Sequence, residues 1–230
     1  MERKVKITHN KFIEMLSDSL ALYEQSVKKE SDTYNAFSRA SFLSVNYALE
    51  SAANSFLKSV EISGELAKQL ERFSTLDKFD FVLQWHTGNK LPKGSKEVQD
   101  IKDIIKRRNA MVHPKVIESE IAITSSFGFS NISALHNEVP VSANVNFFDV
   151  DSDLAFVSIK SLVAFVNFFV LEWWGISPKD AALFILPVWF LSMKPMYEME
   201  SLGLILKYKD DLGVRFLDLD DINGQMERVL

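Results

Sequence analysis

The chain of 230 residues is long enough for one large domain, or for one domain with an appendage, and 47% of its residues are hydrophobic. Its 18 phenylalanines against 8 glycines and 6 prolines favour helices over a turn-rich β protein. The lack of cysteine excludes disulfides, thiol catalysis and cysteine-ligated metals, and a net charge of −5 argues against a protein that is basic over its whole surface.

The N-terminal sequence is basic but lacks the apolar segment of a secretory signal, so we expect a cytoplasmic protein. Apolar residues recur at steps of three and four from Asn10 to Val27 and from Thr33 to Val60, which predicts two long helices. On the second helix, Asn46 lies inside the apolar face and Glu50 at its edge. A buried amide needs a hydrogen-bond partner, which is either structural, such as a neighbouring helix or a water, or part of a functional site.

Residues Gly64–Arg72 predict a third helix, which Lys78–Trp85 continues after a bend. Residues 86–97, HTGNKLPKGSKE, are a loop with glycine and proline. No acidic residue or second histidine is spaced around His86 for a metal site, so we interpret it as structural. The chain also lacks the phosphate-binding glycine motifs and HExxH, and we expect neither a metal nor another cofactor.

Strong bases, an amide and a histidine adjoin a helical apolar stripe in the stretch IKDIIKRRNAMVHPK, residues 101–115. At about 100° per residue, Arg108 falls in the middle of the stripe and Arg107 on the opposite side. We therefore predict that Arg108 points into the interior or a groove, and that Arg107 is exposed. The apolar stripe itself consists of Ile101, Ile104, Ile105 and Val112.

The end of this helix can be predicted from Pro114, which disfavours a helical conformation at the residue before it. The helix should therefore end at about Val112 and place His113 at its C-terminus, one turn from Asn109. Arg108, Asn109 and His113 then converge at one helix end. They form either a functional site or a buried arginine with a structural partner and a capping histidine.

Basic charge is concentrated around this motif. Residues 90–115 hold eight lysines and arginines against three acidic residues, a net charge of +5, whereas the rest of the chain carries 18 basic and 28 acidic residues. A local basic zone on an acidic body fits a site that faces phosphate. The alternative is a solvated helix face with ion pairs one turn apart, such as Asp103 with Arg107.

Residues Val116–Val150 have partial alternation of apolar and polar side chains, which predicts either short strands or irregular loop. The apolar stretch Asp153–Trp174 is long enough to span a membrane. Its polar residues Lys160, Asn167 and Glu172 would make insertion costly, so we expect a buried core helix. This helix would complete a four-helix bundle.

The last part of the chain opens with a helix start, in which Ser177 is the N-cap and Pro178 the first helical residue. Residues 202–220, LGLILKYKDDLGVRFLDLD, resemble a β-hairpin around the turn Lys209–Gly213. We predict a mainly α protein in which residues 1–175 form the bundle and 176–230 a small C-terminal appendage. The appendage must bury its apolar residues against the bundle, a second subunit or a partner.

The run RNAMVH, residues 108–113, resembles the R-x4-6-H signature of HEPN domains in the form with a polar residue directly after the arginine. The proline and lysine that follow are seen in many bacterial members, and the upstream segment NYALESAANSFL, residues 46–57, is similar to a HEPN helix. The resemblance covers about Asn10 to Trp174. It implies an up-and-down helical bundle and a metal-independent endoribonuclease of the toxin or phage-defence kind, which leaves 2′,3′-cyclic phosphate ends.

The resemblance also implies a homodimer with two motifs at one composite site, RNA as substrate and a nucleotidyltransferase-like antitoxin as partner. His113 would act as general acid or base, Arg108 would stabilise charge on the phosphoryl oxygens, and Asn109 would orient His113 or a phosphate oxygen. Glu50 would be the ion-pair partner of Arg108, with Asn46 beside it. The residues expected to hold the RNA backbone are Lys106, Arg107 and Lys115.

Two other hypotheses stand beside this one. The acidic body and the unfamiliar tail are compatible with a non-catalytic HEPN module that binds RNA, a nucleotide or a protein partner. A membrane-associated protein that uses residues 154–174 is the third hypothesis, although we expect no membrane as partner.

Overall fold

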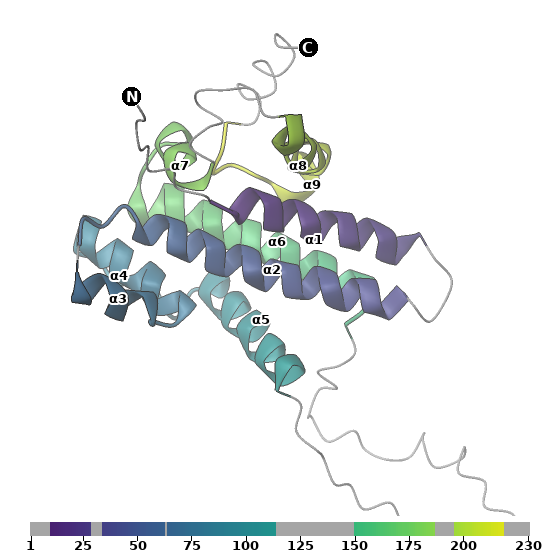
Figure 1. Ribbon diagram of the computed structural model, residues 1–230, viewed down its shortest axis with the longest axis horizontal. Helices are drawn as coiled ribbons and strands as arrows, with labels where there is room; N and C mark the ends of the chain where they lie inside the picture. Colours follow the sequence, from purple (N-terminus) through teal and green to yellow (C-terminus); the bar gives the residue numbers. More distant parts are fainter. Residues whose placement is uncertain (1–9, 29–33, 63, 114–149, 187–195, 219–230) are drawn as a thin grey trace, which may run out of the picture.

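The structure is a computed structural model that describes residues 10–28, 34–62, 64–113, 150–186 and 196–218 (Figure 1). Regular structure within these residues is entirely helical, so the prediction of a mainly α protein is confirmed for them. The predicted strands in Val116–Val150 lie outside the described residues. In chain order the helices are α1 (Phe12–Val27), α2 (Tyr34–Leu57), α3 (Glu65–Glu71), α4 (Thr75–Thr87), α5 (Lys96–Val112), α6 (Ser152–Asn167), the π-helix η2 (Phe168–Trp174), α7 (Pro178–Ile185), α8 (Met196–Lys207) and α9 (Lys209–Leu212).

The centre of the molecule is formed by α1, α2 and α6. Helices α1 and α2 run antiparallel side by side, α6 lies against both, and α3 and α4 cover one end (Figure 1). The abundance of phenylalanine is explained by the hydrophobic core, because large aromatic side chains fill the spaces between the helices. The fully buried phenylalanines are Phe12, Phe42, Phe56, Phe79, Phe165, Phe169 and Phe216.

The long apolar helix predicted at Asp153–Trp174 is present as α6 followed by η2. By length and composition alone, residues 152–174 could cross a membrane, but 56% of the most apolar window is buried inside the structure. Helix α6 contacts α1, α2 and α5, and the side chain of Ile159 is completely buried. The prediction of a core helix is therefore confirmed.

The tail packs on the bundle, with α7 against α2, α8 against α1 and α9 against α6. Ser177 accepts a hydrogen bond from the Asp180 N–H and Pro178 opens α7, as predicted. The predicted β-hairpin is wrong: its first arm lies in the helix α8, and its predicted turn contains the short helix α9, for which Gly213 is the C-cap. The described residues of its second arm, 214–218, form no strand. Leu202 and Ile205 are three residues apart and both are buried; a strand would point them to opposite faces, whereas a helix turns both inward.

Glu24 joins α1 to the tail helix α8. Its carboxylate accepts hydrogen bonds from the ammonium of Lys207 and from the hydroxyl of Tyr208, at 3.1 Å for the latter, and lies 3.8 Å from Lys28 Nζ. The Lys207 hydrogen bond is the main cause that lowers the pKa of Glu24. Burial, together with the Glu24 hydrogen bond, raises the pKa of Tyr208 to about 12.

We expect Glu24→Gln to lower the free energy of unfolding by about 1 kcal/mol near neutral pH, because hydrogen bonds to a charged group become hydrogen bonds to a neutral one. The folded-state pKa of Glu24 lies below its usual value of 4.5. Its contribution is therefore present above pH 4.5 and is lost as the pH falls through the lowered pKa. Urea unfolding at several pH values should show the difference between wild type and variant shrinking in acid; a difference independent of pH would contradict this account.

Candidate functional site

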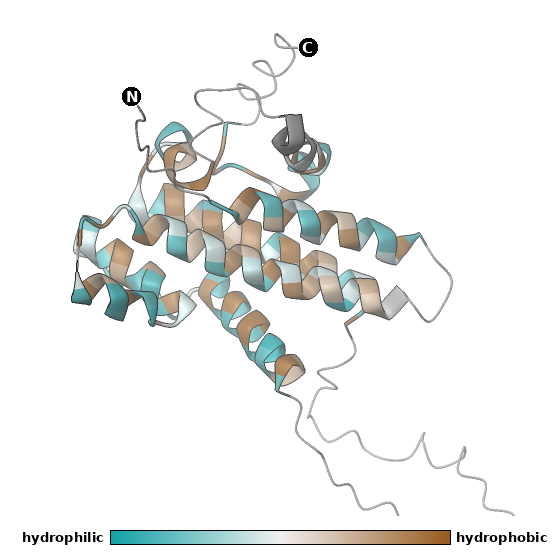
Figure 2. Cartoon of the chain, viewed as in Figure 1, coloured by the Kyte–Doolittle hydropathy of each residue, from teal (hydrophilic) through white to brown (hydrophobic). Residues whose placement is uncertain are grey.

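Helix α5 packs against the bundle at its beginning and projects from it at its end (Figure 1). Ser95 caps it by accepting a hydrogen bond from the Val98 N–H, and Val98, Ile101 and Ile104 are buried against the bundle. The helix then leaves the bundle (Figure 1), and apolar residues continue along the part that projects (Figure 2). Val112 is 44% exposed at the far end. The last turn of α5 is therefore accessible from outside the bundle.

The polar residues of the motif lie at the C-terminal end of α5. Helix α5 ends at Val112 and His113 is its C-cap, as predicted from Pro114. Arg108 Nη1 donates to Asn109 Oδ1 at 3.1 Å, and the His113 N–H donates to the Asn109 carbonyl at 3.0 Å. Asn109 thus connects the guanidinium to the backbone of the histidine. Asn109 and His113 are exposed, and Arg108 is half-buried.

The two predicted supporting residues on α2 are not brought to this group. Asn46 is 7% exposed and donates to the carbonyl of Phe42 in its own helix at 3.0 Å, so its partner is structural. Among the residues that the structure describes, Arg108 makes no ion pair with Glu50, and the predicted pairing is not formed. Glu50 is exposed and lines a groove on α2 instead.

The predicted phosphate-binding residues are placed unequally. Lys106 is exposed on α5, and Lys115 lies outside the described residues. The prediction of an exposed Arg107 is wrong, because this residue is half-buried and lines a groove of about 460 Å³ between α5 and α6. The same groove is lined by Asp100 and Asp103, so Arg107 shares it with two carboxylates. The cause is the direction of α5, which places the Arg107 side of the helix next to α6. Ile101 and Ile104 are buried as predicted, whereas Ile105 is half-buried.

His86 has a structural position, as the sequence predicts. Its Nε2 lies 2.8 Å from Ser59 Oγ, and its ring stacks on Trp174 with the ring centroids 4.7 Å apart. Burial lowers the pKa of His86. Ser59 already donates its hydroxyl hydrogen to the Phe56 carbonyl at 2.6 Å, so it is not activated as a nucleophile. The described residues contain no group of three His, Asp or Glu that could hold a metal ion.

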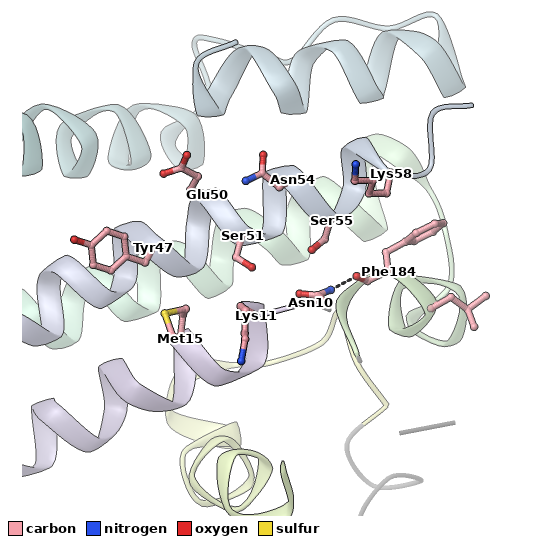
Figure 3. Close-up of a pocket in the computed structure, with 11 residues that line it drawn as sticks. Asn10, Lys11, Met15, Tyr47, Glu50, Ser51, Asn54, Ser55, Lys58 and Phe184 are labelled. Atoms are coloured by element: carbon pink, nitrogen blue, oxygen red, sulfur yellow. Dashed lines mark hydrogen bonds between the residues drawn. The ribbon is translucent and has the colours of Figure 1, made fainter. Parts of the chain in front are cut away.

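A groove of about 590 Å³ was not predicted from the sequence. It runs along one face of α2, with the first turn of α1 across it and the end of α7 at one side (Figure 3). We call it the α2 groove; along α2 it is lined by Tyr47, Glu50, Ser51, Asn54, Ser55 and Lys58. The signal in the sequence is a strip of polar residues at steps of three, one, three, one and three, the spacing of one helix face.

Comparisons with known proteins find no matching family model, no matching curated protein and no matching solved structure.

Proposed function

We propose that this protein is a metal-independent endoribonuclease of the HEPN kind, a toxin or phage-defence effector. The observation that carries the proposal is the position of Arg108, Asn109 and His113 together at the projecting end of α5, where the Asn109 side chain accepts a hydrogen bond from Arg108 and its carbonyl accepts one from the His113 N–H. Their position accounts for how a substrate as long as RNA reaches the group. The resemblance of residues 108–113 to the R-x4-6-H signature supports the same function.

The chemistry needs nothing beyond the RNA and these side chains. The 2′-hydroxyl attacks the adjacent phosphorus, the P–O5′ bond breaks, and the products are a 2′,3′-cyclic phosphate and a 5′-hydroxyl end. His113 takes the 2′-hydroxyl proton or gives a proton to the leaving 5′-oxygen. Arg108 stabilises the charge on the phosphoryl oxygens with its planar fork of donors, and Asn109 keeps that fork in place. DNA lacks the 2′-hydroxyl and should not be cleaved.

The proposed site is composite and lies between two copies of the chain. One motif offers one histidine, whereas this reaction is faster with two proton-transfer groups, which a two-fold axis would supply. The exposed Val112 beside the motif supports an interface there, because a second copy would cover it. A nucleotidyltransferase-like antitoxin is the proposed partner that holds the toxin inactive. A protein that sediments as a monomer at micromolar concentration would contradict the composite site.

Cleavage of a single-stranded RNA in the presence of EDTA tests the function, with analysis of the ends. We expect cleavage with 2′,3′-cyclic phosphate ends and no cleavage of the same DNA sequence. Cleavage that requires a metal and leaves 5′-phosphate would contradict the mechanism. RNA binding without cleavage would favour the alternative, a non-catalytic binding module. The α2 groove supports testing this alternative, because it is separate from the motif and could hold a ligand without cleaving it.

A further inference from the structure

The α2 groove has fixed walls. The Asn10 side chain accepts a hydrogen bond from the Phe12 N–H at 2.9 Å and donates to the carbonyl of Phe184 (Figure 3). It therefore joins the start of α1, on one side of the groove, to α7 at its end. A volume of about 590 Å³ is within the range of small-ligand sites, roughly 300–1,000 Å³, and exceeds what a single phosphate would fill. The groove is thus formed before any ligand binds.

The floor of the groove carries polar groups that the fold does not use. Serines outside the groove use their hydroxyls within the fold: Ser19, Ser41 and Ser59 each donate to a backbone carbonyl. The half-buried Ser51 and Ser55 make no such side-chain hydrogen bond to any residue that the structure describes. Their hydroxyls, which face the groove in part, are therefore available to a ligand.

Asn54, between the two serines, is held in one orientation. Its Oδ1 accepts a hydrogen bond of 2.8 Å from Lys78 Nζ, and Lys78 is only 4% exposed. The amide nitrogen of Asn54 is then left as a donor. With the ammonium groups of Lys11 and Lys58 on opposite sides, donors outnumber acceptors in the groove (Figure 3). The ligand that complements it must therefore be rich in oxygen acceptors.

The order of the groups along α2 narrows the class of ligand. Tyr47, which is 48% exposed, comes first, Glu50 lies one turn further, the hydroxyl and amide groups follow, and Lys58 is last. Glu50 and Lys58 are about 12 Å apart at 1.5 Å per residue. In a nucleotide, a flat base is followed by the ribose hydroxyls and then by a charged phosphate. The ring of Tyr47, the hydroxyl and amide groups and the ammonium of Lys58 would contact these three parts in the same order. We propose that the α2 groove binds one guanine nucleotide of the single-stranded RNA substrate, an inference that takes RNA as ligand from the proposed function.

Guanine is preferred because of the carboxylate beside the aromatic ring. Residues three apart on a helix are neighbours, so a base that stacks on Tyr47 presents its edge to Glu50. Guanine offers two adjacent N–H donors on that edge, which match the two oxygens of a carboxylate. Adenine and uracil do not offer two adjacent donors there. Glu50, which the sequence suggested as a partner of Arg108, would in this way select the base.

The two lysines can turn to a phosphate at little cost. Lys11 pairs with Glu14 and Lys58 with Glu71, the latter at 3.8 Å, and all four side chains are between 45% and 68% exposed. Exposed pairs of this kind contribute little to stability. A phosphate that binds between the lysines therefore replaces weak interactions. This contact should weaken as salt is added, whereas stacking on Tyr47 should not.

The test measures binding without cleavage, in the His113→Ala protein, by fluorescence anisotropy with the labelled tetranucleotides UUGU and UUAU. We expect UUGU to bind about tenfold more tightly than UUAU. Tyr47→Leu should weaken UUGU binding about tenfold, and Glu50→Gln should remove the preference for guanine. The matched controls are Trp85→Leu, an exposed aromatic residue on α4, and Glu65→Gln, an exposed acid on α3, and both should bind as the parent does.

The outcomes separate this inference from the proposed function. The wild-type protein could fail to cleave RNA while the preference for UUGU and the effects of Tyr47→Leu and Glu50→Gln on binding are found. The inference about the α2 groove is then supported, and the proposed nuclease function is contradicted. If the wild type cleaves RNA but Tyr47→Leu and Glu50→Gln bind both tetranucleotides as the parent does, the inference is overturned. Free GMP should compete more weakly than UUGU; equal competition would overturn RNA as the ligand.

Discussion

Replacing His113 with alanine should lower the rate of RNA cleavage by about a hundredfold or more. His113 is the C-cap of α5 and is exposed, so its ring is accessible to a substrate without any change in the bundle. Alanine removes the proton-transfer group but keeps the backbone N–H that donates to the Asn109 carbonyl at 3.0 Å. The variant should therefore fold as the wild type does, and the loss should appear in the rate of cleavage and not in RNA binding.

The two neighbouring arginines provide a matched comparison for the same assay. Arg108 hydrogen-bonds to Asn109 in the motif, whereas Arg107 lies in the α5–α6 groove with Asp100 and Asp103. Arg108→Ala should lose about a hundredfold in rate, because charge on the phosphoryl oxygens is no longer stabilised. Arg107→Ala removes the same charge one residue away and should have a much smaller effect, which shrinks in high salt. Equal losses for both arginines would indicate general electrostatic attraction in place of the proposed site.

Single-turnover cleavage in EDTA, with circular dichroism as the test of folding, checks these variants. A growth assay gives the same comparison in cells, because expression of an active nuclease should slow growth and His113→Ala should relieve it. A folded His113→Ala protein that cleaves at the wild-type rate would contradict the assigned role.

Local signals were enough to predict where the motif helix ends. The end of α5 at Val112 follows from Pro114, and the position of Arg108, Asn109 and His113 at that end follows from their spacing in the sequence, so no knowledge of the rest of the fold was needed. The same holds for the cap at Ser177 and for most helices. These features depend on residues within one turn of each other.

Features that depend on distant parts of the chain were predicted poorly. A helical wheel gives the face on which Arg107 lies, but the direction in which α5 leaves the bundle decides whether that face meets α6 or solvent. The sequence predicts an ion pair of Glu50 with Arg108 from the position of Glu50 at the edge of an apolar face, yet Glu50 lines the α2 groove, and this depends on how α1 and α7 pack on α2. The segment of α8 has β-forming residues, and its packing against α1 overrides that propensity.

Asn167 shows how a residue that sequence analysis noticed for one reason has another role. In the sequence it counts against a membrane span. In the structure it is 4% exposed on α6, and its side chain binds the backbone of the tail. Its Nδ2 donates to the Gly213 carbonyl at 2.8 Å, and its Oδ1 accepts from the N–H groups of Arg215 and Phe216 at 2.8 and 2.9 Å. One amide thus holds the chain where α9 ends.

Asn167→Leu should therefore lower the free energy of unfolding by about 2–4 kcal/mol, because three hydrogen bonds are lost and the N–H groups of Phe216, which is buried, and Arg215, which is partly buried, are left without this acceptor. Leucine has the same number of side-chain heavy atoms with the same branching and is no smaller, so the loss would not come from a cavity. The matched control is Ser158→Ala, also on α6 and 2% exposed, whose hydroxyl bonds to the Leu154 carbonyl of its own helix and to no other residue that the structure describes. It should cost no more than about 1 kcal/mol.

Urea unfolding compares the two variants, and hydrogen exchange locates the effect. Phe216, which is fully buried with its ring 5.7 Å from that of Phe12, should lose amide protection in Asn167→Leu and retain it in Ser158→Ala. Equal stabilities with unchanged protection at Phe216 would mean that apolar packing alone holds the tail.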